Sequence, residues 1–294
     1  MTKIYYVQDL DFFEAPGGAE QTDRVYFKEG LKRGHDLNLI TPHSPLGVEK
    51  DDLVILSNIR AYERSKILGI PCRTVTFTHD TWCAYRLYLP LTEKCFTDCP
   101  EYPFWNKVYE NAELNIFLSP LHYEIHKERF GESVEPHFLT PSGFDDVDRF
   151  VDMKNGRSGV CNLNGLLGFK GREQLFKYAG EHPEVAMDIG GSNMEGDKRL
   201  DVDLPPNIRY VGPIQSSELP KFYNKYEFYV ELHDRPQPYN RTIVESYLSG
   251  CKLIVNSLVG ATSWPWFTDR DSVRAHLKSA PSEFWVKLEK ELNL

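Results

Sequence analysis

The sequence predicts an α/β protein of two Rossmann-like, doubly wound domains that face a cleft. Short β-branched or apolar segments alternate with amphipathic segments, as in parallel sheets whose strands are joined by helices. The alternation runs twice along 294 residues, a length that suits two domains. A polar, glycine-containing segment at 152–156 separates the two runs. We therefore expect domains at 1–150 and 151–270, followed by a C-terminal helix within 271–294.

The first domain opens on a strand, because a β-branched and aromatic segment lies at the N-terminus and turns acidic at Asp9 and Asp11. Amphipathic segments occupy several of the intervals between the later strands. The predicted strands are Ile4–Val7, Leu37–Ile40, Leu53–Leu56, Thr74–Thr78, Asn115–Leu118 and His137–Leu139, and the predicted helices are Ala19–Arg33, Tyr102–Asn111 and Pro120–Phe130.

The second domain repeats this pattern until Pro265, where the alternation stops. Beyond it, Phe284, Leu288 and Leu292 recur at four-residue intervals and predict one amphipathic helix. The predicted strands of this domain are Ser158–Asn162, Val185–Ile189, Ile208–Val211, Phe228–Leu232 and Leu253–Val255, and the predicted helices are Arg172–Glu181, Ser217–Lys225 and Thr242–Ser249.

Composition and charge disfavour several classes of protein. The 34 basic and 43 acidic side chains leave a net charge of −9, whereas a general nucleic-acid binder would carry a basic excess. No apolar run approaches the roughly 18 residues of a membrane helix, and the N-terminus resembles a strand more than a signal peptide. We expect a soluble, cytoplasmic protein without an integral membrane segment, whose six cysteines are free thiols or metal ligands.

Two glycine-containing turns lead from a strand to a helix. Gly17 and Gly18 precede the first predicted helix, and Lys170-Gly171 precedes the helix that starts near Arg172. Such turns let an anion approach backbone N–H groups at the positive end of a helix, and a lysine adds a point charge. A tight turn that needs glycine for steric reasons explains the first equally well, and an exposed Lys-Gly turn explains the second. Neither matches the dinucleotide fingerprint or the P-loop, so NAD is not supported.

Two further side chains lie where ligands of α/β proteins bind. Glu245 falls early in the predicted helix that ends before Gly250. A carboxylate there can accept hydrogen bonds from both hydroxyls of a ribose, or it can simply stabilise the helix N-terminus. His79 ends a predicted strand and could contact a sugar hydroxyl or be structural. With Cys83, Cys95 and Cys99 it forms a conceivable zinc set, although the spacing matches no standard zinc motif; our prediction is no metal.

Six segments in chain order resemble the GT-B glycosyltransferases, closest to the large retaining family four. They are the glycine loop Gly17–Glu20, the histidine segment Thr78–Asp80, the hinge Pro141–Phe150, the diphosphate-site pair Lys170–Gly171, the strand Asn207–Gly212 and the donor motif that contains Glu245 and ends at Gly250.

The resemblance implies a retaining, metal-independent transferase without a cofactor, whose C-terminal domain binds a nucleotide-sugar donor and whose N-terminal domain faces the acceptor. Lys170 would neutralise the leaving diphosphate, Glu245 would hold the ribose, and His79 would contact the transferred sugar. The Gly17–Gly18 loop would face the phosphate across the cleft, and the final helix would cross back onto the N-terminal domain. A lysine and a helix N-terminus together can disperse leaving-group charge without a metal.

Two positions depart from the family pattern. Gln237 replaces the first glutamate of the donor motif, and Gly165 replaces an arginine five residues before Lys170, for which Arg241 or Arg172 could substitute. An alternative is therefore a catalytically weak or inactive GT-B module that binds a nucleotide, a glycan or a partner protein. The predicted catalytic residues are His79, Gln237 and Lys170, and the predicted donor-binding residues are Gly17, Gly18, Lys170, Arg241 and Glu245.

The acceptor stays open among a glycan, a small molecule, a protein and modified DNA. The base and sugar of the donor also stay open, because the loops that select them are not decoded by motif spacing. A GT-B epimerase and a metal-dependent GT-A enzyme fit the segments less well.

Overall fold

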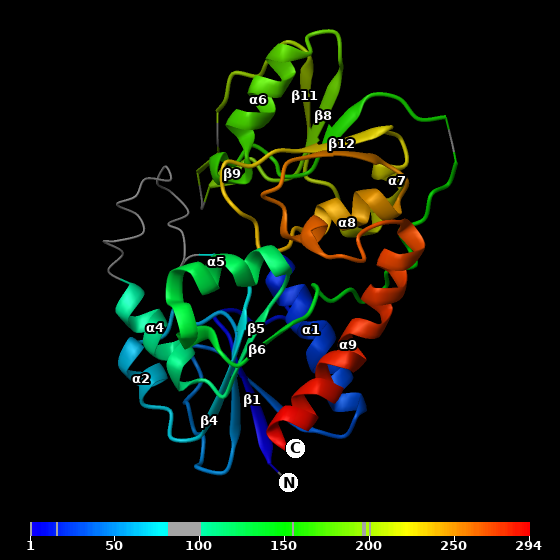
Figure 1. Cartoon of the computed structure of the whole chain (residues 1–294). Helices are drawn as coiled ribbons and strands as arrows, with labels where there is room; N and C mark the ends of the chain where they lie inside the picture. Colours follow the sequence, from blue (N-terminus) through cyan, green and yellow to red (C-terminus); the bar gives the residue numbers. More distant parts are fainter. Residues whose placement is uncertain (1, 16, 82–100, 155, 196–197, 200) are drawn as a thin grey trace. The chain divides into compact units, whose positions relative to one another are not determined.

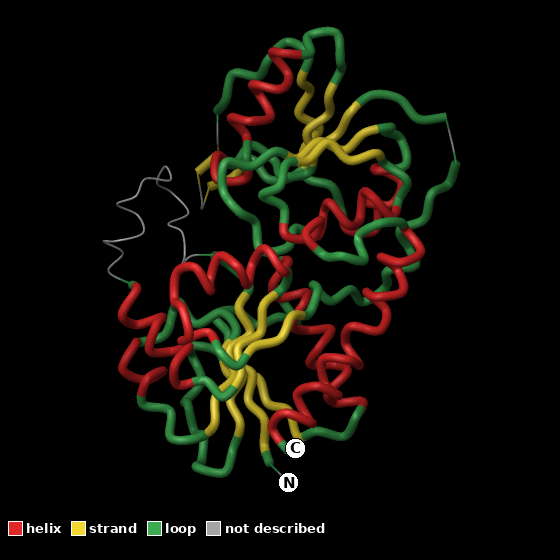
Figure 2. The backbone as a smooth tube through the Cα atoms, viewed as in Figure 1, coloured by secondary structure: helices red, strands yellow, loops and turns green. Residues whose placement is uncertain are grey.

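The computed structural model of the protein describes residues 2–15, 17–81, 101–154, 156–195, 198–199 and 201–294. The chain divides into two compact units. Unit 1 comprises Met1–Asp145 and Ala275–Leu294, and unit 2 comprises Asp146–Arg274. In each unit helices flank both faces of a parallel sheet (Figures 1 and 2). The protein is therefore of the α/β class, with two doubly wound sheets.

Unit 1 has, within its described residues, a six-stranded sheet whose neighbouring strands all pair in parallel. Its order is β2-β1-β3-β4-β5-β6, so the direction of winding reverses between β1 and β3. Ligands of open α/β sheets bind beside the carboxyl ends of the strands at such a reversal. The strands are β1 (Lys3–Val7), β2 (Asp36–Ile40), β3 (Leu53–Leu56), β4 (Arg73–Thr78), β5 (Leu114–Phe117) and β6 (His137–Leu139).

Helices α1 (Gly18–Lys32) and α9 (Arg270–Leu292) cover one face of this sheet (Figure 1). The α9 side chain Phe284 packs on Tyr26 of α1 and Phe77 of β4. Helices on the opposite face bury Phe104, Val108 and Ile125 against the strands. These helices are α2 (Arg64–Leu68), α4 (Tyr102–Asn111) and α5 (Pro120–Phe130), with the short 3₁₀ turn η1 (Gly131–Val134) after α5.

Two buried histidines of α5 link the stability of unit 1 to pH. Burial lowers the pKa of His122 well below its ordinary value and that of His126 to about 4, with a partial opposing effect from a backbone hydrogen bond in each case. Below pH 6.5 these histidines take up protons in the unfolded chain but stay neutral in the folded chain. The free energy of unfolding therefore decreases as the pH is lowered. We expect His126 alone to remove on the order of 3 kcal/mol of unfolding free energy between pH 6.5 and 4.

Denaturant unfolding at a series of pH values measures this loss. The variant His126→Phe should make the curve less steep between pH 6.5 and 4, because phenylalanine suits the aromatic surroundings of Tyr109 and Phe117 and does not titrate. His79, whose pKa the Asp23 carboxylate raises against the effect of burial, changes stability in the opposite sense in both proteins. The difference between the two curves therefore reports His126 together with its electrostatic effect on the pKa of His122. Parallel curves for wild type and variant would contradict the prediction.

Unit 2 has, among the residues that the structure describes, a five-stranded parallel sheet of order β11-β8-β7-β12-β13. Its winding reverses between β7 and β12, the first and fourth strands of this sheet along the chain. Its strands are β7 (Val160–Asn162), β8 (Met187–Gly190), β11 (Ile208–Gly212), β12 (Phe228–Glu231) and β13 (Lys252–Val255), and a separate antiparallel pair is formed by β9 (Met194–Glu195) and β10 (Lys198–Arg199).

The helices of unit 2 bury opposite faces of its sheet. Leu175 and Ala179 of α6 (Arg172–Glu181) pack with Val230 of β12. On the other face Tyr223 of α7 (Leu219–Tyr223) meets Tyr229 of β12. That face also carries α8 (Arg241–Leu248), and short 3₁₀ turns lie at η2 (Gly168–Lys170), η3 (Ser216–Glu218) and η4 (Gly260–Ser263).

Most predicted elements are confirmed, and the bounds of α4, α5 and α6 coincide with the predicted ones. The prediction missed α2, a five-residue helix too short to show a helical repeat, and the β9–β10 pair. The predicted helix Ser217–Lys225 is a 3₁₀ turn followed by α7. Within the described parts of the chain, no helix has both the length and the apolar character of a membrane span.

Candidate functional site

Lys170 ends the turn η2, two residues before α6 begins, at the carboxyl edge of the unit 2 sheet. The adjacent Gly171 has a φ of 82°, and a Cβ there would lie 2.1 Å from the carbonyl oxygen of Leu232. Glycine therefore lets the first turn of α6 reach the end of β12. Burial lowers the pKa of Lys170, and the Glu231 carboxylate opposes this effect. The arrangement sets a lysine beside the N–H groups of a helix N-terminus, which is chemistry suited to an anion.

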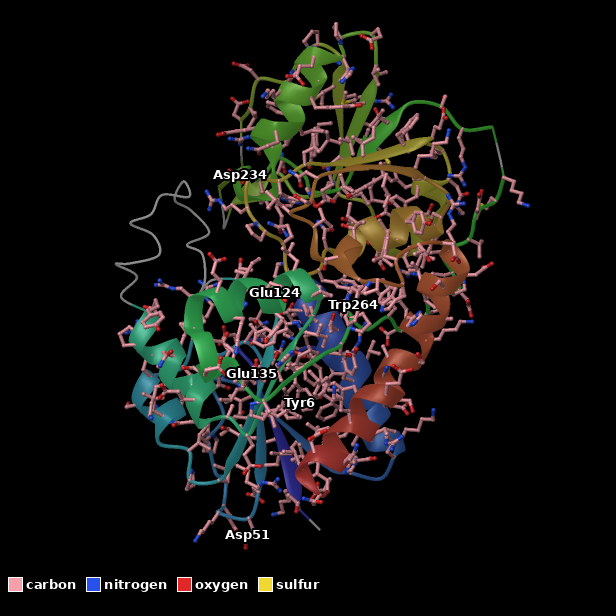
Figure 3. The ribbon with its side chains drawn as sticks, in the orientation of Figure 1. Tyr6, Asp51, Glu124, Glu135, Asp234 and Trp264 are labelled. Atoms are coloured by element: carbon pink, nitrogen blue, oxygen red, sulfur yellow. The ribbon has the colours of Figure 1, made fainter. Side chains whose placement is uncertain are left out.

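Glu231, the last residue of β12, is a functional candidate that our sequence analysis missed. It is 1% exposed, and its carboxylate accepts hydrogen bonds from Asn164 Nδ2 at 2.6 Å and His233 Nε2 at 2.7 Å. Asp234 marks this edge of the sheet in Figure 3. Burial raises the pKa of Glu231, but hydrogen bonds from His233, Asn164 and Tyr229 outweigh burial and lower it overall. A buried carboxylate thus lies next to the lysine and the start of α6.

Arg241 and Glu245 lie on α8, but Glu245 turns toward α7. Its carboxylate is buried and accepts a hydrogen bond from Tyr223 at 3.2 Å. Arg241 Nε lies 4.0 Å from Glu245 Oε1. Burial raises the pKa of Glu245, and Arg241 and Tyr223 oppose this. The structure places Arg241 at the N-terminus of α8 and Glu245 one turn inside the helix, and a role in holding a ribose stays a prediction.

Gln237 is held in the loop between β12 and α8. Its backbone N–H donates to the carbonyl oxygen of Leu258 at 2.7 Å, and its own carbonyl oxygen accepts from the N–H of Gly260 at 2.9 Å. Its side chain is largely buried and donates to the carbonyl of Arg235 at 3.4 Å. The backbone of Gln237 is thus fixed in this loop, and its catalytic role stays a prediction.

The structure shows why a glycine suits position 165. Gly165 has a φ of 66°, and a Cβ there would lie 2.0 Å from the carbonyl oxygen of Ser192. A side chain does not fit at this contact between two loops. Arg172, one proposed substitute, donates to the carbonyl of Leu166 at 3.1 Å and so stabilises the same loop.

In unit 1, His79 forms a buried pair with Asp23 of α1. His79 Nε2 lies 2.8 Å from Asp23 Oδ1, and Ser57 Oγ donates to the other carboxylate oxygen at 2.5 Å. Burial lowers the pKa of His79, but the Asp23 carboxylate outweighs this and raises it overall. Among the described residues His79 Nδ1 has no hydrogen-bond partner. Asp23 and Ser57, which our sequence analysis missed, therefore orient the imidazole.

Gly17 and Gly18 lie at the start of α1, as expected, with Gly17 as the N-cap. A Cβ on Gly17 would lie 2.0 Å from Glu20 Oε2, so an acidic side chain already lies at this helix end. A phosphate there would meet a like charge, and phosphate binding at this loop stays a prediction.

Cys83, Cys95 and Cys99 lie outside the described residues. Within the described residues, no group of three or more His, Cys, Asp or Glu side chains is arranged to hold a metal ion.

No protein-family model matches the sequence, and no curated protein matches it either. The structure is similar to sucrose-phosphate synthase from Thermosynechococcus elongatus, with a TM-score of 0.68, 13% identity and coverage of 96% of this chain and 91% of that one. A glycosyltransferase from Rickettsia africae matches with a TM-score of 0.64, 11% identity and coverage of 99% and 98%. Anabaena HepE in complex with UDP-glucose matches with a TM-score of 0.59, 14% identity and coverage of 98% and 95%.

The chain has the GT-B fold. The fold class expected from the sequence is confirmed, because each match spans nearly the whole of both chains.

Proposed function

We propose that the protein is a glycosyltransferase that moves a sugar from a nucleotide-diphosphate sugar to an acceptor. The observation that carries the proposal is Lys170 beside the N-terminus of α6, next to the winding reversal of a sheet in a GT-B fold. HepE, a protein of similar structure, binds UDP-glucose. A lysine with several backbone N–H groups is suited to the two phosphates of such a donor.

Each site residue then has a chemical task. Lys170 and the N–H groups of α6 stabilise the charge that develops on the leaving diphosphate, so that our proposal needs no metal ion. Glu245 binds the ribose, Arg241 assists Lys170 at the diphosphate, and Gln237 hydrogen-bonds a sugar hydroxyl. His79, held by Asp23, contacts the transferred sugar. We further propose retention of the anomeric configuration, on the resemblance to family four.

The acceptor is a hydroxyl-bearing glycan, small molecule, protein or modified DNA. The net charge of −9 argues against a bulk nucleic acid and against an anionic membrane surface as the acceptor's environment.

A second candidate function is a GT-B module that binds a nucleotide, a glycan or a partner protein without transfer. Gln237 and Gly165 favour it, because both positions lack the charged side chain of the family pattern.

A screen of nucleoside diphosphates and nucleotide sugars by thermal shift tests the proposal. A ligand at 100 times its Kd stabilises the folded state by about 2.7 kcal/mol, so the donor and its parent nucleoside diphosphate should raise Tm more than nucleotides with another base. The best donor is then incubated with candidate acceptors in excess EDTA, and NMR of the product reports its anomeric configuration. We expect transfer in EDTA with retention. Nucleotide binding without transfer to any acceptor supports the second candidate, and no binding to any nucleotide overturns both nucleotide-based functions.

A further inference from the structure

Glu231 lies where the winding of the unit 2 sheet reverses. It ends β12, which pairs with β7 at this reversal. The chain leaves β7 through Asn164 toward α6 and leaves β12 toward α8. A side chain at this point can therefore contact both segments that lead into these helices.

One set of hydrogen bonds joins Glu231 to the start of α8. Asn240, the residue before the helix, donates its side-chain amide to Glu231 Oε1, and Thr242 Oγ1 donates to Oε2 at 3.0 Å. Asn240 has a φ of 78°, which is unfavourable for a residue other than glycine. The carboxylate thus holds the residue whose backbone sets the direction in which α8 begins.

A second set joins Glu231 to the start of α6. Asn164 Nδ2 donates to Glu231 Oε1 at 2.6 Å and to the carbonyl oxygen of Lys170 at 3.1 Å. The close approach of Gly171 to Leu232 brings the same helix start against the residue that follows Glu231. The Asn164 side chain therefore links the backbone of Lys170 directly to the Glu231 carboxylate.

The network is specific to a carboxylate. Four donors converge on its two oxygens, namely Asn164, Tyr229, His233 and Asn240. The single hydroxyl proton of Thr242 is shared between Glu231 Oε2 at 3.0 Å and Asn240 Oδ1 at 2.7 Å. An apolar side chain of similar size would fill the space but leave buried donors unpaired, whereas glutamine would keep one acceptor oxygen and turn its amide toward two hydroxyls that can also accept.

We propose that Glu231 is a positioning residue of the donor site, which holds the N-termini of α6 and α8 in the relative placement that a diphosphate sugar requires. This inference rests on the proposed function. Glu231 acts through Asn164, Asn240 and Thr242 rather than by touching the donor. Small displacements of such groups are costly, since about 1 Å of misplacement can lower a rate by about a hundredfold.

The test compares Glu231→Leu, Glu231→Gln and the control Asp188→Asn. Asp188 also accepts hydrogen bonds within unit 2, from Arg209 and Tyr226, but it lies on β8 and contacts neither helix start through them. UDP, ADP, GDP and TDP are titrated into each protein by calorimetry, and donor KM and kcat are measured at a temperature where all variants are folded by circular dichroism. A purely structural defect lowers kcat with the folded fraction and leaves KM and Kd unchanged.

We expect Glu231→Leu to raise the Kd of the best nucleotide and the donor KM by about tenfold or more, with Glu231→Gln within about threefold of wild type. Asp188→Asn should leave both constants unchanged. Unchanged constants in Glu231→Leu, or an equal rise in the control, would overturn the inference. If the leucine variant does not fold, Thr242→Val and Asn164→Ala replace it, because each removes one hydrogen bond to Glu231. Each variant should raise the Kd of the best nucleotide. An unchanged Kd in both would overturn the inference. Failure of the wild type to bind any nucleotide would instead contradict the proposed function.

Discussion

Replacement of Lys170 by alanine should lower kcat for sugar transfer by about 10²–10³-fold. Lys170 supplies the point charge beside the N-terminus of α6, and loss of one preorganised group that stabilises developing charge has an effect of this size. The truncation keeps the fold, because the backbone of this turn is fixed by Gly171 and by the hydrogen bond from Asn164 to the Lys170 carbonyl. Steady-state kinetics with the donor found in the nucleotide screen measure the loss.

Lys177→Ala is the matched control. Lys177 lies on the same helix and carries the same charge, but its side chain is 78% exposed and its nearest acidic partner, Glu181, is 4.0 Å away. Its removal should leave kcat and KM unchanged. Similar kcat values for Lys170→Ala and wild type would contradict the proposal that Lys170 stabilises the leaving diphosphate. An equal decrease in kcat in both variants would instead indicate a general effect of the charge on this helix.

Replacement of Trp285 by alanine should destabilise unit 1 by about 3–5 kcal/mol. The indole of Trp285 is fully buried, and its Nε1 donates to the carbonyl oxygen of Tyr26 at 2.7 Å. Gly30 of α1 leaves room for the ring, since a Cβ there would lie 2.3 Å from it. The truncation creates a cavity and leaves the Tyr26 carbonyl without this donor, and both effects favour unfolding.

Denaturant unfolding followed by circular dichroism measures the change. The neighbouring Val286 is 52% exposed, and Val286→Ala serves as a control that should shift the midpoint little. Equal midpoints for the two variants would mean that α9 contributes little to the stability of unit 1.

Elements with strong local signals could be predicted from the sequence. Helix α5 begins at Pro120 after Ser119, whose hydroxyl accepts a hydrogen bond from the N–H of His122, and both residues are typical of a helix start. The strand–helix alternation that predicts two doubly wound sheets also depends on residues that are close together in the sequence. Lys170 could be located as well, because a lysine and a glycine before a helix are adjacent in sequence.

The sequence by itself determined the α/β class, the two sheets and the position of Lys170, because each depends on residues a few positions apart. The tertiary structure alone decided the surroundings of these residues. It pairs His79 with Asp23, 56 positions away, and it brings Asn164 and Thr242 to Glu231 from 67 and 11 positions away. A glutamate that ends an apolar strand has no local feature that marks it as buried. Its role follows only from strand order, which places the loops after β7 and β12 side by side.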